Sequence, residues 1–446
     1  MKLWQKTAVK SNTAQNVDQF TVGKDRELDI FLAKYDIQGS LAHITMLSEV
    51  GLLPQADLQP LQTALKKLYR QATKGNLVIE DGIEDIHSQV EFLLTQQLGD
   101  LGKRIHAGRS RNDQVLVDLK LFFRAEIREI TEKVGVLAKT LLQQSDKYQH
   151  VLMPGYTHLQ AAMVSSFGLW FGAYAETLTD DLLQLQAVYK IVNQNPLGSG
   201  AGYGGSLPLN RQRTTELLGF EEMNYNVVHA QMGRGKSEHF VSFGIAAVAH
   251  TLAKLSMDIC LYMNQNFDFM TLPDELTTGS SIMPHKKNPD VFELIRAKCN
   301  RLQSLPSEVA LLTSNLPSGY HRDFQLLKEI VFPAISTLKE CLEMTDFMVQ
   351  QLKIKNNILK DAKYKYLYTV EAVNELVMNG LPFRDAYRQV GQSVDNQTFS
   401  YDKPIHHTHE GSIGNLCNDA IQAKIERILK SFDFEKTDSV IKQLVF

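Results

Sequence analysis

The chain contains 446 residues, of which 43% are hydrophobic and 22% charged, and its formal net charge is -3 at pH 7. A domain averages roughly 150 residues, so the length predicts about three domains with large cores. The nearly balanced charge argues against a nucleic-acid partner and against binding to an anionic membrane.

The N-terminus, Met1 to Lys6, leads into polar residues and lacks the apolar stretch of a secretory signal. Further along the chain, no apolar run reaches the length of a membrane span. The cysteines form no C-x-x-C pair, which argues against a disulfide framework or a zinc ribbon; they are Cys260, Cys299, Cys341 and Cys417. These features predict a cytoplasmic protein with reduced thiols and no membrane partner.

Amphipathic helices are predicted from Asp25 to about Lys74, because apolar residues recur there at three- and four-residue spacing. Asp85 can cap the next helix, which places His87 in its first turn. Taken alone, this histidine is more typical of a hydrogen-bonded structural residue than of a catalyst. Strand signals are almost absent, and the best candidate is the short segment Leu77 to Glu80.

A basic, glycine-bearing stretch from Gly102 to Gln114 precedes the first long helical pattern. Either Ser110 or Asn112 can cap that helix, so the stretch predicts a helix N-terminus with basic side chains beside it. Such an end attracts anions, although a basic surface loop explains the same residues equally well.

Long apolar-periodic segments follow. The first runs without proline from Asp113 to Gln149, a rod of roughly 55 Å at 1.5 Å per residue. Similar patterns cover residues 163–193, 237–266 and 291–312. Helices this long are seldom stable alone, so we expect a bundle whose apolar faces are also shared between subunits.

The fold class predicted from these segments is mainly α. A long central helix bundle is expected over residues 111–360. Smaller helical domains are expected on either side of it, over residues 1–110 and 361–446, because the helical patterns there are shorter.

Polar, glycine-rich loops join the rods. The first spans Pro154 to Gln160 and puts Thr157 and His158 just before the second rod. His158 fits a capping or core histidine, and a role in proton transfer is the competing interpretation. The second loop, Gly198 to Gly205, could be mistaken for a phosphate-binding loop, but no strand precedes it and no Gly-Lys-Ser/Thr follows.

The third loop runs from Gly279 to Asp290 and brings hydroxyl, ammonium and amide groups close together. Asn288 is predicted as an N-cap and Pro289 as the first residue of the next helix. The positive end of that helix would then lie beside Lys286, next to the mobile hydroxyl of Ser280. This arrangement suits removal of a proton next to a carboxylate, whose developing dianion needs cations. Solvated lysines on an ordinary turn are the alternative.

Three histidines and a glutamate lie close together between His406 and Glu410. They are too crowded for ordinary zinc-site spacing, and a polar loop is the preferred interpretation. No site for a redox or covalent cofactor is evident, so neither a metal nor a cofactor is expected.

Assembled, these segments resemble the argininosuccinate lyase family of the fumarase/aspartase superfamily over nearly the whole chain. The loop from Gly279 is shared across the superfamily, whereas residues 110–114 and 382–386 favour this family over adenylosuccinate lyase and fumarase. The matching segments besides that loop are Gly108–Gln114, Pro154–Gln160, Asn195–Gly198 and Gly380–Ala386. The resemblance implies a fumarase/aspartase-like fold and the reversible elimination of argininosuccinate to arginine and fumarate, the last step of arginine synthesis.

The resemblance also implies roles for individual residues. Ser280 would be the base that removes the succinyl proton, helped by a cationic pocket because a hydroxyl is not ionised unaided at neutral pH. Lys286 and Asn288 would hold the carboxylate where negative charge develops, and His158 would assist proton transfer or orient the leaving nitrogen. The implied substrate-binding residues are Thr21, His87, Ser110, Arg111, Asn112, Thr157, Arg234, Tyr320, Gln325 and Lys328. The family assembles as a homotetramer whose active sites combine loops of three subunits.

The chain departs from the family pattern at positions that are usually acidic. Leu326 and Leu327 follow Gln325, and Gly233 and Gly235 flank Arg234. Loss of these acids leads to the hypothesis that the arginine end of the substrate is an N-acylated derivative without a cationic amine. Another lyase of the superfamily, such as adenylosuccinate lyase, and a catalytically silent scaffold like some lens crystallins remain as alternatives.

Overall fold

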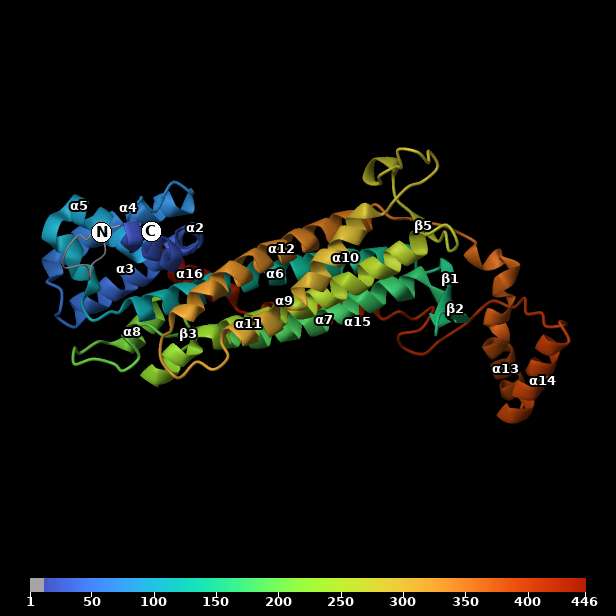
Figure 1. The fold of residues 1–446 in the computed structure, drawn as a ribbon. Coiled ribbons are helices and arrows are strands. Elements are labelled where there is room, and N and C mark those ends of the chain that lie inside the picture. The colour runs from blue at the N-terminus through green and yellow to red at the C-terminus, as the bar shows by residue number, and fades with distance from the viewer. Residues whose placement is uncertain (1–11) are drawn as a thin grey trace.

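The computed structural model describes residues 12–446, and these form an elongated molecule built around a bundle of long helices (Figure 1). Within the bundle α6 packs against α7 and α12, and α9 packs against α7, α10 and α11. The bounds of these helices are α6 Arg111–Lys147, α7 Phe167–Val192, α9 Val227–Met263, α10 Asp290–Leu302, α11 Leu305–Leu312 and α12 Leu326–Gln350.

Apolar side chains at three- and four-residue spacing hold the bundle together. On α6 they are almost completely buried, at 0 to 2% exposure, and they include Phe123, Ile127, Ile130, Val134 and Leu137. Full burial of one such side chain stabilises the fold by roughly 1.5–3 kcal/mol before the entropy of ordering is counted. The predicted long-helix bundle therefore follows from the periodicity that suggested it.

Two rods differ from the prediction. The pattern over residues 291–312 is not one helix, because α10 ends at Leu302 and α11 begins at Leu305 with Pro306 in its first turn. The rod expected to begin at Ser237 starts earlier, at Val227, and is kinked where Gly235 takes a φ of 79°. Proline fits a helix start and glycine takes positive φ at little cost, so each break lies at a residue suited to it.

The N-terminal helices lie at one end of the bundle, where α3 contacts α4, α5 and α6 (Figure 1). The predicted strand at Leu77 to Glu80 is wrong: within residues 12–446 this segment pairs with no strand, and the N–H of Glu80 donates to Gln89 Oε1 at 2.8 Å. The helices of this end are α1 Asn12–Val22, α2 Asp25–Asp29, η1 Ile30–Leu32, α3 Ala33–Glu49, α4 Gln55–Thr73, α5 Ile86–Leu98, η2 Gly99–His106 and α8 Arg211–Leu217.

The opposite end of the bundle carries a β-hairpin that sequence analysis took for a polar loop. In it β1 (Leu152–Thr157) pairs antiparallel with β2 (Gln160–Ser166), and Leu152 lies opposite Ser166. The two turn residues, His158 and Leu159, have φ angles of 55° and 58°, the left-handed values of a type I′ turn. His158 therefore lies at the tip of a hairpin and not directly before α7.

Other strands and short helices are small connectors. The parallel pair is β3 Gln194–Asn195 with β4 Glu222–Met223, and the antiparallel pair is β5 Met270–Thr271 with β6 Lys353–Ile354. The short helices are η3 Asp274–Leu276, η4 Arg322–Gln325, η5 Ile358–Lys360 and η6 Ala362–Tyr368.

The C-terminal elements lie in separate places. Helices α13 (Thr369–Met378) and α14 (Phe383–Asp395) form a hairpin beyond the β1–β2 end, whereas α15 (Asn418–Lys430) lies along α6 and α7. The last helix, α16 (Phe434–Val445), packs against α3 and α8, so the C-terminus lies beside the N-terminal helices (Figure 1). The division into three domains stays a prediction.

By length and composition alone, α9 could cross a membrane, which the sequence analysis did not anticipate. In the fold, however, 61% of its most apolar window is buried within the molecule. A core helix of a globular bundle passes the same test, because it is apolar all round. All four cysteines are free thiols in the fold.

Candidate active site

A cavity of about 270 Å³ opens at the N-terminal end of the bundle. It brings together many of the residues predicted to bind substrate, although they are far apart in the sequence: His87, Arg111, Asn112, Arg234, Tyr320, Gln325 and Lys328. Thr21 lies beside them, because its carbonyl oxygen accepts a hydrogen bond from Gln325 Nε2 at 3.1 Å. This part of the predicted site is therefore assembled within one chain.

The start of α6 forms one wall of this cavity. Ser110 is the N-cap, as one of the two predicted alternatives had it, and it forms a capping box with Asp113, whose Oδ1 accepts from the Ser110 N–H at 2.8 Å. Arg111 Nη1 pairs with Asp85 Oδ2 at 3.0 Å, and Arg111 Nη2 donates to Ser88 Oγ at 2.7 Å. A helix N-terminus and a guanidinium thus face the same space, which suits an anion.

Lys328 is the buried cation of the cavity, at 4% exposure. Its Nζ lies 2.6 Å from Asp25 Oδ1 and 2.5 Å from Asp29 Oδ1. Burial opposes the charge, but the two carboxylates outweigh it and raise the pKa of Lys328. The ammonium is therefore fixed in place and charged before any substrate arrives.

Arg234 lies at the kink of α9, buried between two acceptors. Its Nε is 2.8 Å from Glu238 Oε1, and its Nη2 donates to the Phe324 carbonyl oxygen at 2.8 Å. The neighbouring Gly235 has a φ of 79°, and a Cβ there would lie 2.7 Å from Thr313 Cγ2. Backbone geometry and close packing thus explain why a glycine and not an acidic residue occupies position 235.

The other missing acids have different surroundings. Leu327 is buried at 1% exposure and belongs to the core, where a carboxylate would be costly. Leu326 is 45% exposed, and a Cβ added at Gly233 would meet nothing within 4 Å. At these two positions packing gives no reason for the departure from the family pattern.

His87 contributes a buried imidazole to the cavity. Asp85 caps α5 by accepting from the Ser88 N–H at 2.8 Å, so His87 lies in the first turn as predicted. Its Nδ1 is 2.7 Å from Asp36 Oδ1 and 3.5 Å from Asp118 Oδ2. Although burial favours the neutral ring, these carboxylates raise the pKa of His87 to about 10.

The same three side chains could be mistaken for a metal site, because one donor atom of each lies within 4.8 Å of the others. The distance from Nδ1 to Asp36 Oδ1 is that of a hydrogen bond, which requires a proton where a metal would sit. The buried guanidinium of Arg109 also acts electrostatically on both carboxylates. We interpret the cluster as a network of charged groups.

Ser280 lies in the exposed loop between η3 and α10, at the other end of the bundle. Its Oγ accepts hydrogen bonds from the N–H groups of Ile282 at 3.3 Å and Met283 at 3.1 Å. Donors aimed at a hydroxyl oxygen favour its negative form, so the loop can help Ser280 to act as a base. Lys286 is exposed in the same loop.

The predicted N-cap of α10 is wrong. The helix begins at Asp290, with Pro289 in the cap position, and no side chain caps it. Asn288 instead bridges the base of the loop: its N–H donates to the Thr278 carbonyl oxygen at 2.9 Å, and its Nδ2 lies 3.4 Å from Thr278 Oγ1. The side-chain amide of Asn288 therefore binds Thr278 and does not cap α10.

The predicted site residues thus fall into two groups that lie at opposite ends of the bundle (Figure 1). Thr157, His158 and the Ser280 loop are at the β1–β2 end, while Ser110 and Arg111 begin α6 at the other. The 37 residues of α6 separate these ends, which is about 55 Å at 1.5 Å per residue. Within one chain the two groups are therefore far apart.

Several charged residues of the cavity were not predicted as site residues, namely Asp25, Asp29, Glu84, Asp85 and Arg322. The four acids among them balance the cations of the cavity: Glu84 Oε1, for example, pairs with Arg322 Nη2 at 3.1 Å. The run of acids in the short α2 and the position of Arg322 beside Tyr320 were signals that could have been used.

In the glycine loop at residues 198–205, several backbone N–H groups are already bound within the protein. Asp113 Oδ2 accepts from the N–H groups of both Gly198 and Gly200, each at 3.0 Å. The polar cluster near the C-terminus is likewise engaged, since His407 pairs with Glu371 Oε1 at 3.0 Å and with Ser412 Oγ at 2.8 Å.

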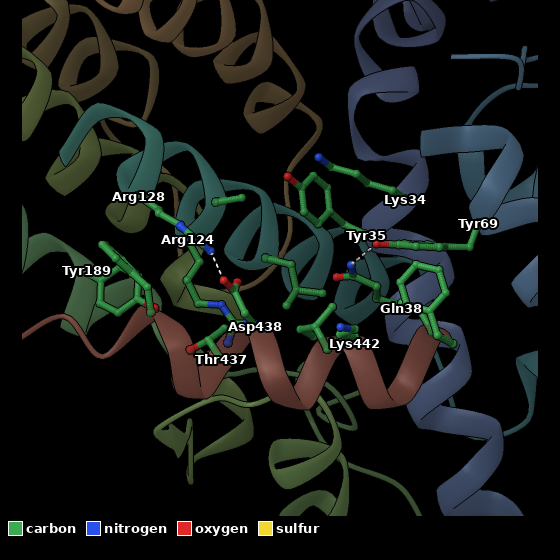
Figure 2. Close-up of a pocket in the computed structure, with 16 residues that line it drawn as sticks. Lys34, Tyr35, Gln38, Tyr69, Arg124, Arg128, Tyr189, Thr437, Asp438 and Lys442 are labelled. Carbon is green, nitrogen blue, oxygen red and sulfur yellow. Dashed lines mark hydrogen bonds and ion pairs between the residues drawn. The ribbon is translucent and has the colours of Figure 1, made fainter. Parts of the chain in front are cut away.

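A separate cavity of about 380 Å³ lies between α16 and the helices α3, α4, α6 and α7 (Figure 2). Arg124 reaches it from α6, and its Nη atoms donate to Asn193 Oδ1, Leu218 O and Gly219 O at 3.1, 2.9 and 3.0 Å. Because these acceptors are neutral, burial dominates and lowers the pKa of Arg124 to about 10. None of the predicted site residues lines this cavity.

Comparisons with known proteins agree with these observations. A family model described as Lyase matches residues 10–304. An argininosuccinate lyase of Bacteroides fragilis is 58% identical over 444 residues, which cover 100% of this chain and 99% of that protein.

Solved structures are similar over nearly the whole length. The crystal structure of EDDS lyase in complex with formate matches with a TM-score of 0.79 and 20% identity, covering 98% of this chain and 94% of that one. Class II fumarase from Schistosoma mansoni matches with a TM-score of 0.70 and 17% identity, covering 97% and 96%. The predicted mainly α, fumarase/aspartase-like fold is confirmed.

Proposed function

The chain belongs to the argininosuccinate lyase family, and we propose that it eliminates fumarate from argininosuccinate, reversibly, to leave arginine in arginine biosynthesis. The observation that carries the proposal is the 58% identity to a protein of that name over essentially the full length. The enzyme is a carbon–nitrogen lyase. The cation-lined cavity at the start of α6 supports an anionic substrate.

The chemistry divides between the two groups of residues. Ser280, with two N–H groups directed at its Oγ, would remove the proton from the succinyl carbon next to a carboxylate. Lys286 and Asn288 would hold that carboxylate while negative charge develops on it. The C–N bond then breaks, fumarate forms, and the guanidino nitrogen of arginine takes up a proton that His158 delivers or directs.

The cavity at the N-terminal end would bind the rest of the substrate. The residues proposed for this role are Thr21, His87, Ser110, Arg111, Asn112, Arg234, Tyr320, Gln325 and Lys328, with Thr157 at the hairpin. Both groups must meet in one site for the reaction to occur, since binding energy counts only where the reacting atoms are held.

A homotetramer with active sites shared between subunits would satisfy this requirement. What supports it is the separation of about 55 Å along α6 between the two groups. Exposed apolar side chains on the bundle helices, such as Phe243, Leu294, Leu311 and Phe347, also favour association. We place the enzyme in the cytoplasm, where reduced thiols and amino-acid biosynthesis are expected.

The test is fumarate release, followed by ultraviolet absorbance, from argininosuccinate, an N-acylated argininosuccinate and adenylosuccinate in parallel. Rapid release from plain argininosuccinate is the expected result. Release from the acylated form alone would mean that Gly233 and Leu326, which lack a packing reason, mark a changed specificity. Release from adenylosuccinate alone would assign another lyase of the superfamily, and no release from any substrate would favour a silent scaffold.

A further inference from the structure

The ion cluster behind the cavity has a role that rests on the proposed function and deepens it. We propose that Asp36 and Asp118 are positioning residues that hold His87 as an imidazolium, so that its Nε2–H binds a carboxylate of the substrate. His87 contributes the contact itself, whereas the two aspartates set which nitrogen of the ring carries a proton and where the ring points.

The two ring nitrogens of His87 face different surroundings. Nδ1 faces inward, 2.7 Å from Asp36 Oδ1 on α3 and 3.5 Å from Asp118 Oδ2 on α6. His87 lines the cavity, and its Nε2 makes no hydrogen bond to any residue in the described range 12–446. Nε2 is therefore the atom available to a ligand.

Burial of the two acids strengthens their attraction for the His87 ring. Asp36 and Asp118 are 2% and 1% exposed, so water cannot screen their attraction for the ring. Both oxygens of Asp118, and Oδ2 of Asp36, have no hydrogen-bond partner among the described residues. Burial and the neighbouring Asp36 raise the pKa of Asp118, so Asp36, whose Oδ1 is 2.7 Å from Nδ1, supplies the larger share of the negative charge that faces the ring.

Other charges face the ring, and on balance they favour the cation. The groups that act electrostatically in this cluster are Asp29, Asp36, Asp85, His106, Arg109, Arg111 and Asp118. Arg109 lies close enough to compensate part of the negative charge, yet the pKa of His87 remains raised to about 10 by Asp36 and Asp118. The His87 ring therefore stays protonated at neutral pH and does not release and regain its proton in each turnover.

The chemical consequence lies in the direction of one hydrogen bond. A neutral imidazole with its proton on Nδ1 has an acceptor at Nε2, which repels a carboxylate. The imidazolium has a donor there, with a full positive charge behind it. The acids thus convert a repulsive contact with the substrate into an attractive one without touching the substrate.

The first experiment measures His87 in the enzyme without substrate. Imidazole NMR signals of histidine-labelled protein are followed from pH 6 to 9, and His87 is assigned by the signal that His87→Gln removes. His87 is expected to stay protonated throughout. A titration midpoint near the ordinary value of about 6.5, or displacement of the proton by added Zn²⁺, would overturn the proposal.

The second experiment follows kcat/KM against pH for the wild type, Asp36→Asn and Asp118→Asn. In Asp36→Asn the introduced amide still accepts from Nδ1–H but no longer supplies charge, so Nε2 loses its proton as the pH rises. Relative to the wild type, kcat/KM of Asp36→Asn should fall by at least about tenfold between pH 6 and 8.5, mostly through KM. Asp118→Asn should show the same trend more weakly, because its oxygen is 3.5 Å away.

Controls separate this role from a structural one. Asp100→Asn changes an exposed carboxylate at the same end of the molecule and should follow the wild type at every pH. A loss in Asp36→Asn that is equal at all pH values would mean that Asp36 acts only in folding. If Asp36→Asn does not fold, the pH profile of Asp118→Asn and the wild-type NMR titration still test the proposal. If the wild type is inactive on argininosuccinate, the proposed function is wrong. The NMR titration would still test separately whether His87 is protonated.

Discussion

Asp113 and Gly198 join the start of α6, a helix of 37 residues, to a glycine loop 85 residues away, through a 3.0 Å hydrogen bond from the Gly198 N–H to Asp113 Oδ2. The same carboxylate also accepts from Gly200 and Ser110, so one buried side chain satisfies three backbone donors. Hydrogen bonds to a charged group contribute about 1.5–3 kcal/mol each, and burial of the charge offsets part of this.

Asp113→Ala should therefore lower the free energy of unfolding by about 3 kcal/mol, measured by urea denaturation at fixed protein concentration. Asp100→Ala removes an exposed carboxylate that pairs with Lys103 and serves as the control. The control should leave the urea midpoint unchanged. Equal midpoints for both variants would mean that the loop is held by other contacts.

Ser280→Ala should lower kcat at least about 1,000-fold and leave the assembly intact, because the base is lost and the exposed loop carries little of the core. Fumarate absorbance gives the rate, and size-exclusion chromatography gives the assembly. Ser281→Ala, next to it in the loop, is the matched control and should retain most of the activity. Substantial turnover by Ser280→Ala would place the base elsewhere.

Two inactive variants should complement each other if the active site is shared. Arg111→Ala disables the N-terminal group and Ser280→Ala disables the loop group, and the two groups are about 55 Å apart in one chain. Co-expressed with different tags and purified as mixed assemblies, they should be at least about tenfold more active than either alone. An inactive mixture would argue that each chain works independently.

The buried carboxyl group of Asp181 should make the stability of the fold depend on pH. Burial raises its pKa to about 6, and Thr251 Oγ1 donates to its Oδ2 at 2.7 Å. Between about pH 4 and 6 the folded state therefore holds a proton that the unfolded state has lost. Stability falls as the pH rises through this range and stays lower above it, by up to about 3 kcal/mol.

Asp181→Asn removes this loss, since the amide oxygen still accepts from Thr251 and carries no charge. Its melting temperature should exceed that of the wild type at pH 8 and match it near pH 4. Asp180→Asn changes the exposed neighbour and should keep most of the wild-type difference between the two pH values. A gain that is the same at both pH values would count against ionisation as the cause.

Leu159 is 80% exposed and has a φ of 58°, a conformation that costs an ordinary residue about 1–2 kcal/mol. Leu159→Gly should relieve this strain and raise the melting temperature, whereas Leu159→Ala keeps the strain and should not. A lower melting temperature for both variants would show that the side chain is packed against another chain in the assembly. Thermal unfolding at fixed protein concentration distinguishes these outcomes.

Helices and their caps were predictable where the signal was local. Ser110 caps α6 because a serine followed by Asp113 can satisfy the orphan donors of a helix start, whatever the rest of the chain does. The prediction failed for Asn288, whose amide meets Thr278 across the loop. That contact depends on the path of the loop, which no local pattern records.

The β1–β2 hairpin was missed for a related reason. Its turn residues, His158 and Leu159, are not the Asn-Gly or Gly-Gly pairs that normally signal left-handed turn geometry. The site was similarly half predictable: the resemblance picked out Ser280 and Lys328, but their placement at opposite ends of the bundle became clear only in the fold. The acids that surround Lys328 form a visible run in α2, but their contact with a lysine about 300 residues away is set by packing.

The position of α16 bears on how the protein is made. This last helix packs against α3 and α8, and Asp438 on it forms an ion pair with Arg128 of α6. The ion pair joins residues that are 310 positions apart in the sequence, so contacts of high sequence separation complete this end of the molecule. The substrate-binding cavity, although built largely by early segments of the chain, thus lies at an end of the bundle that is complete only once a distant helix has packed onto it.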